Sequence, residues 1–260
     1  MTTCGETARG PAPLETRSTV KASLMITCLG DALYPQVGVA AVKVLEALGV
    51  EVDFPAGQVC CGQPAFNSGY REEARTSARA YLRAFAASEH VVSISGSCAA
   101  MVRRHYPVLF AGCPEEAAAR ALAERTYEFS QFLVDVLGVT ELPVRYRARV
   151  TFHHSCHTRR LLGVVEQPER LLGMVEGLEY VPLPRAEECC GFGGTFAVKM
   201  PAISSSLVDD KVDHVLETGA DELLGLDMSC LMNIGGRLSR RGSTVRVRHL
   251  AEVLAEGWGR

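Results

Sequence analysis

The chain contains two sets of four cysteines that follow the same order along the sequence. In each set a lone cysteine is followed by a Cys-Cys-Gly triplet and then by another lone cysteine. The first interval is 32 positions in one set and 33 in the other, and the second interval is 37 and 40. Because iron–sulfur clusters are usually held by four thiolates, this repetition predicts two metal-cluster sites. The first set is Cys28, Cys60, Cys61 and Cys98, and the second set is Cys156, Cys189, Cys190 and Cys230.

Two other chemistries remain open for these thiols. Zinc also binds four cysteines in structural sites, usually from short Cys-x₂₋₄-Cys pairs that these sets lack, and zinc at one site stays an alternative. Adjacent thiols can also form a redox-active disulfide. Iron–sulfur chemistry is favoured because Gly62 and Gly191 follow the cysteine pairs. Glycine permits a tight turn there and lets backbone N–H groups approach cluster sulfur.

The segments that must position these cysteines alternate between predicted strands and predicted helices. β-branched and apolar runs precede the cysteines, whereas apolar residues at helical spacing follow them. Such alternation predicts βαβ units with parallel strands, whose carboxyl ends meet at one sheet edge. We therefore expect the cysteine loops of each set to meet at that edge. The predicted strands are 22–27, 50–54, 90–95, 150–154, 179–183 and 222–226, and the clearest helices are 71–87 and 201–217.

The predicted fold class is therefore α/β, with two tandem βαβ repeats, parallel sheets and cysteine loops at the strand C-terminal ends. We place the first cysteine-rich repeat at 22–147 and the second at 148–260, after a disordered tail at 1–21. Amphipathic helices at 133–137 and 250–254 close the two repeats, and 108–125 is an inserted Ala-rich helix.

Composition limits the functional classes that remain. The chain has 260 residues, 47% of them hydrophobic, and a net charge of −3, which argues against nucleic-acid binding. Five arginines near the C-terminus are interpreted as a solvated face or a docking surface for a partner. We find no signal peptide and no apolar run long enough for a transmembrane segment, so we expect a cytoplasmic protein with reduced thiols. The arginines are Arg237, Arg240, Arg241, Arg246 and Arg248.

Several other residues could take part in chemistry. Cys4 and Cys113 fall outside the repeated sets and are expected to be unpaired, exposed thiols. Lys199 is expected at the surface, and the nearby Gly-rich run matches no nucleotide-binding pattern. Three histidines flank Cys156, and one of them could be a ligand or hydrogen-bond donor, although ordinary strand-end histidines are expected. They are His153, His154 and His157.

The two cysteine sets resemble the tandem CCG cysteine-rich domains of two redox proteins, the CCG-containing subunit of heterodisulfide reductase and the glycolate oxidase iron–sulfur subunit. The chain is most similar to the lactate utilization protein A family, and the similarity covers nearly everything after the tail. Residues 96–102, 187–196, 209–211 and 229–237 carry this resemblance.

The resemblance implies an iron–sulfur electron-transfer subunit of an L-lactate-oxidising complex, with up to two clusters bound by the eight cysteines. It also implies a ferredoxin-type iron–sulfur partner and a further subunit. The heterodisulfide reductase repeats carry a fifth cysteine, replaced here by Met101 and Asn233, so one 4Fe-4S cluster per repeat is expected. No residue is assigned a catalytic role, and the complex rather than this chain is expected to be the enzyme. A zinc-stabilised interaction module and a thiol-disulfide or quinone reductase related to heterodisulfide reductase remain alternatives.

Overall fold

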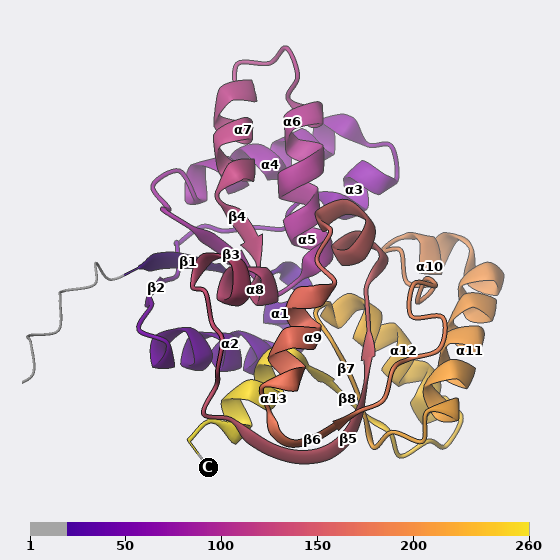
Figure 1. Cartoon of the computed structure of the whole chain (residues 1–260). Helices are drawn as coiled ribbons and strands as arrows, with labels where there is room; N and C mark the ends of the chain where they lie inside the picture. Colours follow the sequence, from indigo (N-terminus) through magenta and orange to yellow (C-terminus); the bar gives the residue numbers. More distant parts are fainter. Residues whose placement is uncertain (1–19, 260) are drawn as a thin grey trace, which may run out of the picture.

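Two four-stranded parallel sheets organise the molecule, which a computed structural model describes from residue 20 to residue 259 (Figure 1). The strand orders β2-β1-β3-β4 and β6-β5-β7-β8 repeat one topology, so the predicted α/β class with tandem repeats is confirmed. The first sheet consists of β1 (Lys21–Met25), β2 (Glu51–Asp53), β3 (Val91–Ser93) and β4 (Thr126–Glu128). The second consists of β5 (Arg145–His153), β6 (Glu176–Tyr180), β7 (Glu222–Gly225) and β8 (Arg246–His249).

Helices connect the strands in both repeats. In the first repeat they are α1 (Cys28–Leu33), α2 (Pro35–Ala47), α3 (Gln63–Asn67), α4 (Arg71–Ala84), α5 (Gly96–Ala100), the π-helical η1 (Met101–His105), α6 (Tyr106–Leu109), α7 (Glu116–Glu124), α8 (Phe129–Gln131) and the π-helical η2 (Phe132–Val136). In the second they are the π-helical η3 (Thr158–Leu162), α9 (Glu166–Gly173), α10 (Phe196–Lys199), α11 (Pro201–Glu217), α12 (Met228–Arg240) and α13 (Leu250–Gly257). The predicted insertion at 108–125 overlaps two helices, α6 and α7, instead of one.

The fourth strand of each sheet was not predicted. β4 is three residues long and β8 four, and both pair in parallel with the third strand of their sheet. A strand at a sheet edge does not need a continuous apolar run. The charged residues Arg246 and Arg248 therefore gave the β8 segment the sequence pattern of a turn.

The two repeats pack through their helices in a reciprocal way. The closing helix α13 of the second repeat packs on α2 of the first, as Figure 1 shows by the yellow ribbon beside the indigo one. The closing segment of the first repeat, α8 and η2, packs on α9 of the second. Val44 of α2 and Leu254 of α13 are fully buried in one core that both repeats build. The domain limits 22–147 and 148–260 stay predictions, and most of the predicted tail, residues 1–19, lies outside the described residues.

Candidate metal-cluster site

The lone cysteines lie in the first turns of helices. Cys28 begins α1, Cys98 lies in α5, Cys230 lies in α12, and Cys156 begins the helical segment before η3. We expected all the cysteines in loops, which is correct only for the Cys-Cys pairs. Free backbone N–H groups and the helix dipole favour a negative charge at a helix N-terminus, so these positions suit thiolates.

A glycine in the left-handed conformation turns the chain after each cysteine pair. Gly62 has a φ of 82° and Gly191 has a φ of 80°. A Cβ atom at position 191 would lie 2.5 Å from the Ser204 carbonyl oxygen of α11. The predicted glycine turns are therefore confirmed, and at position 191 the helix packs too closely for any side chain.

The turned chain brings the thiols of each set into contact. In the first set, Cys28 Sγ lies 3.6 Å from Cys60 Sγ, and Cys61 Sγ lies 3.4 Å from Cys98 Sγ. In the second set, the sulfur atoms of Cys190 and Cys230 lie within 4.8 Å of each other, and the Gly191 N–H donates to Cys189 Sγ at 3.3 Å. Each set of four thiols is called a quartet below.

Neighbouring thiols shift one another's pKa values. Hydrogen bonds from Cys28 and Cys61 lower the pKa of Cys60, whereas the hydrogen bond that Cys28 donates to Cys60 raises the pKa of Cys28. In the second quartet, Cys156 and Cys190 likewise lower the pKa of Cys189. Thiols that share protons in this way lose them together when a metal binds, because only thiolates are ligands.

All eight thiols line one cavity between the two repeats. The cavity encloses about 870 Å³ of empty space, part of it open to solvent, and polar residues such as Gln63, Ser97 and His157 also line it. The sequence indicated two sites but not that both open into the same cavity. This arrangement follows from the facing carboxyl edges of the two sheets.

Asp227 joins the two repeats beside the cavity. One of its carboxylate oxygens accepts hydrogen bonds from the Ser95 hydroxyl at 3.0 Å and the Ser97 N–H at 2.9 Å. The other accepts from the Ser229 N–H at 3.1 Å and so caps α12. The Gly96 N–H adds a bond to the Leu226 carbonyl at 3.1 Å. The role of Asp227 was not predicted; its signal was an N-cap residue three positions before the last cysteine, as at Ser95.

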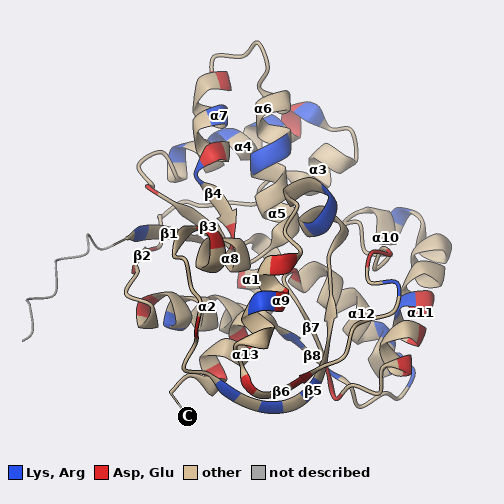
Figure 2. Cartoon of the chain, viewed as in Figure 1, with Lys and Arg blue, Asp and Glu red and all other residues tan. Residues whose placement is uncertain are grey.

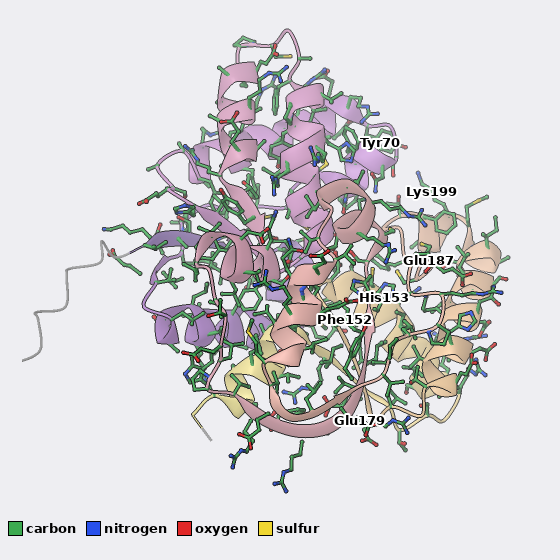
Figure 3. The ribbon with its side chains drawn as sticks, viewed as in Figure 1. Tyr70, Phe152, His153, Glu179, Glu187 and Lys199 are labelled. Atoms are coloured by element: carbon green, nitrogen blue, oxygen red, sulfur yellow. The ribbon has the colours of Figure 1, made fainter. Side chains whose placement is uncertain are left out.

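The three histidines near Cys156 have different environments. His154 Nε2 lies 3.2 Å from Glu169 Oε1, as expected for an ordinary strand-end histidine. His157 Nδ1 lies 3.4 Å from Cys156 Sγ at the cavity wall. His153, in the interior of Figure 3, is buried, and neither ring nitrogen has a hydrogen-bond partner among the described residues. Burial lowers the pKa of His153 to about 3, so its ring is neutral.

His153 is also the histidine closest to a metal-binding geometry. One ring nitrogen of His153 and the sulfur atoms of Cys190 and Cys230 lie within 4.8 Å of one another. We expected an ordinary strand-end histidine with hydrogen-bonded ring nitrogens, which is wrong for His153 because neither nitrogen has a partner among the described residues.

The positions of the missing fifth cysteines have other uses. Asn233 donates its side-chain N–H to the Cys190 carbonyl at 2.8 Å, and Met101 is buried in the core of the first repeat. In the first repeat the Tyr106 hydroxyl donates to the Cys61 carbonyl at 2.9 Å. The backbone of Cys61 and that of Cys190 are thus each held by a side-chain hydrogen bond.

The remaining candidates lie away from the quartets. Cys113 is a free thiol, but it is half-buried against the apolar core around α4 and α7, so the expectation that it is exposed is wrong. Cys4 is outside the described residues. Lys199 is exposed, as predicted, and its ammonium lies 5.5 Å from the centre of the Tyr70 ring (Figure 3).

The C-terminal arginines mostly form ion pairs. Arg237 contacts Asp209 at 2.5 Å, Arg241 contacts Asp213 at 2.7 Å, and Arg246 contacts Glu222. Figure 2 shows acidic and basic segments lying together on α11. The interpretation of these arginines as a solvated face or a docking surface for a partner stays a prediction.

The donor set fits a thiolate-bound metal cluster. Each quartet offers four soft sulfur ligands, the type that iron–sulfur clusters and zinc prefer over carboxylates. Such a cluster supplies one-electron redox chemistry when bound. Cys28, Cys60, Cys61 and Cys98 would hold one group, and Cys156, Cys189, Cys190 and Cys230 would hold the other.

Together, two parallel sheets and two Cys-Cys-Gly quartets define a tandem CCG protein. The family model for the CCG cysteine-rich domain matches the chain twice, at residues 23–103 and 150–235. Lactate utilization protein A of Geobacillus kaustophilus is 56% identical over 236 residues, covering 90% of this chain and 98% of its own length. Lactate utilization protein A 2 of Bacillus cereus is 52% identical over 240 residues, covering 92% and 99%. The chain belongs to the lactate utilization protein A family.

A solved structure supports the fold alone. A hypothetical protein from Helicobacter pylori matches with a TM-score of 0.61 at 11% sequence identity, and the match covers 92% of this chain and 49% of the other. This chain thus spans about half the length of that protein. Within residues 20–259, no helix has the length and apolar character needed to cross a bilayer.

Proposed function

We propose that this chain is the iron–sulfur electron-transfer subunit of an L-lactate-oxidising complex. One observation carries the proposal: eight thiols from two repeats line a single cavity. The family relationship supports the link to lactate, because relatives more than 50% identical over nearly their whole length are named for its utilization. Each quartet holds one cluster, a 4Fe-4S cluster in this proposal.

The protein residues around the cavity have separate tasks. The cysteines bind and orient the clusters, Gly62 and Gly191 allow close backbone approach, and Asp227 holds the two repeats in register. The chain itself carries no complete site for lactate oxidation in this proposal. It works in the cytoplasm with a ferredoxin-type iron–sulfur subunit and a further subunit.

Anaerobic reconstitution tests the proposal. The purified chain is incubated with iron and sulfide, desalted, and analysed for both elements, for visible absorbance and by electron paramagnetic resonance. We expect about eight iron and eight sulfide ions per chain, since two four-cysteine sites each hold up to four of each. When the reduced chain is mixed with the other subunits of the complex, it should then pass its electrons to the electron acceptor of that complex. A colourless chain without iron or labile sulfide would refute the proposal.

Zinc in the second repeat is the second candidate. The position of His153 beside Cys190 and Cys230 favours it, because zinc commonly binds mixed nitrogen and sulfur ligands. In that case the second repeat is an interaction module that zinc stabilises. Zinc analysis of the anaerobically purified protein distinguishes the two, since one zinc with half the iron indicates a mixed protein.

A further inference from the structure

The two quartets have different surroundings although their cysteines match. α11 follows the second Cys-Cys pair and α4 follows the first, and both pack on the glycine of their pair. A Cβ atom at Gly62 would meet Ala74 and Ser77, and one at Gly191 would meet Ser204 and Leu207. Ser204 therefore corresponds to Ala74, a shift of 130 positions. The same shift places Lys211 where the first repeat has Tyr81.

Lys211 is a buried lysine on the face of α11 that packs against the Gly191 turn. Ser204 lies two helical turns before it and donates from its hydroxyl to the Gly191 carbonyl at 2.8 Å. Lys211 has no exposed surface, and its ammonium donates to the Arg185 carbonyl at 2.7 Å, in the segment that leads into Cys189. Residues seven apart lie on the same face of a helix, so the lysine is directed at this segment.

The ammonium of Lys211 lacks a carboxylate partner. No carboxylate in residues 20–259 comes within 4.0 Å of it, and Glu188 pairs with Arg185 and His214 instead. A buried charge is costly unless an opposite charge or several hydrogen bonds compensate it. Burial lowers the pKa of Lys211, and negative charge at Glu188 and Cys190 opposes that shift. The negative charge around this cation therefore comes from Glu188 first and then from the second quartet.

The first quartet has an aromatic environment at the corresponding place. Tyr81 is fully buried, stacks on Phe85 with ring centres 4.4 Å apart, and meets Tyr106 edge-on. Among residues 20–259, no lysine or arginine is buried beside the first quartet. Asp227 is bonded to Ser97 next to Cys98 and to Ser229 next to Cys230, and its negative charge contributes to the raised pKa values of Cys156 and Cys230 in the second quartet. Lys211 is thus the buried cation that distinguishes the second environment from the first.

We propose that Lys211 makes the cluster of the second quartet the more easily reduced of the two, an inference that rests on the proposed iron–sulfur function. Reduction adds one electron and one negative charge to a cluster without making or breaking a bond. A nearby buried cation stabilises the added charge. Electrons that enter this chain therefore come to rest at the second quartet.

Redox titration with dithionite, followed by electron paramagnetic resonance, tests the inference on the reconstituted chain. Cys61→Ser isolates the second cluster and Cys190→Ser isolates the first. We expect the second to have the higher potential, and the opposite order would overturn the inference. Lys211→Met should then lower only the potential of the second cluster, by a tenfold or larger change in the reduction equilibrium, which is about 59 mV for one electron.

Matched variants distinguish charge from structure. Lys211→Arg keeps the charge and should keep the potential. Lys211→Gln keeps an N–H donor for the Arg185 carbonyl but should lower the potential of the second cluster as Lys211→Met does. If Lys211→Met does not bind its cluster, the potential of Lys211→Gln tests the inference in its place. Tyr81→Phe should leave both potentials unchanged. Normal iron and sulfide counts with an unchanged potential in Lys211→Gln refute this inference alone, whereas missing iron in the wild-type protein refutes the proposed function.

Discussion

At the scale of single residues, Cys61 and Cys190 are the most enclosed members of their Cys-Cys pairs. Each keeps 3% of its surface exposed, and each carbonyl accepts a hydrogen bond from a side chain, Tyr106 or Asn233. A buried sulfur has few ways to relax around a substitution, because protein interiors are closely packed.

Replacing Cys61 should therefore remove one cluster. A serine hydroxyl is a poor ligand for iron–sulfur clusters, which are held by thiolates. We expect Cys61→Ser to lose about half of the iron and sulfide, since one of two such sites is lost. Cys113→Ser is the matched control and should keep the full complement. Unchanged metal content in Cys61→Ser would show that Cys61 is not a ligand.

The hydrogen bond of Asn233 should contribute to folding stability. Asn233→Asp removes the N–H donor and places a carboxylate oxygen against the Cys190 carbonyl. We expect the free energy of unfolding to fall by about 1–3 kcal/mol, the usual cost of an unsatisfied buried group. Urea denaturation of the metal-free protein measures it. Asn67→Asp, an exposed change, should be close to neutral, and equal costs for the two would contradict this account.

At the scale of elements, the sequence predicted the long helices, whose apolar residues recur at a regular spacing. It missed the short strands, which depend on pairing with a neighbouring strand. α11 has the predicted bounds, 201–217, because Pro201 begins a long amphipathic pattern. β4 and β8 were missed because short edge strands depend on their neighbours more than on their own residues. The helical positions of Cys98 and Cys230 were missed because each helix begins with a capping serine or aspartate whose effect is local.

The turn at Gly191 should resist substitution more than other glycine turns. Gly163 also has a positive φ, 72°, but a Cβ atom there would meet nothing within 4 Å. Gly163→Ala should cost about 1–2 kcal/mol, the penalty of the left-handed conformation. Gly191→Ala should cost more, since its Cβ would also clash with the Ser204 carbonyl. Urea denaturation compares the free energies of unfolding of the two variants. Similar losses of stability would show that α11 moves easily to make room for the added Cβ atom.

At the scale of the whole molecule, the repeats are joined through buried polar groups at the strand ends. The neutral ring of His249 donates from Nε2 to the Ile94 carbonyl of the other repeat at 3.0 Å, and its Nδ1 accepts from the Ala251 N–H at 3.1 Å. The sequence predicted each repeat from its own pattern. It could not predict the contact between them, because residues 94 and 249 are related only by the tertiary fold.

His249 should make the stability of the protein depend on pH. Burial lowers its pKa from 6.5 to about 4, so between these values the unfolded chain binds the proton and the folded chain does not. Stability is therefore full above pH 6.5 and falls as the pH drops toward 4, by roughly 3 kcal/mol. His249→Gln keeps a donor but cannot titrate, so its stability should fall less over this range. Parallel curves from urea denaturation at each pH would contradict this role.

The reciprocal packing of α13 on α2, and of α8 with η2 on α9, is the contact pattern of a homodimer with twofold symmetry, here joined into one polypeptide. In a true homodimer every substitution appears twice, so both centres must stay alike. Fusion removes that constraint, so Lys211 in one repeat can occupy the position that corresponds to Tyr81 in the other. Because the two halves are covalently linked and can differ in sequence, electrons can move preferentially from one centre to the other. Two identical subunits related by an axis cannot provide that preference.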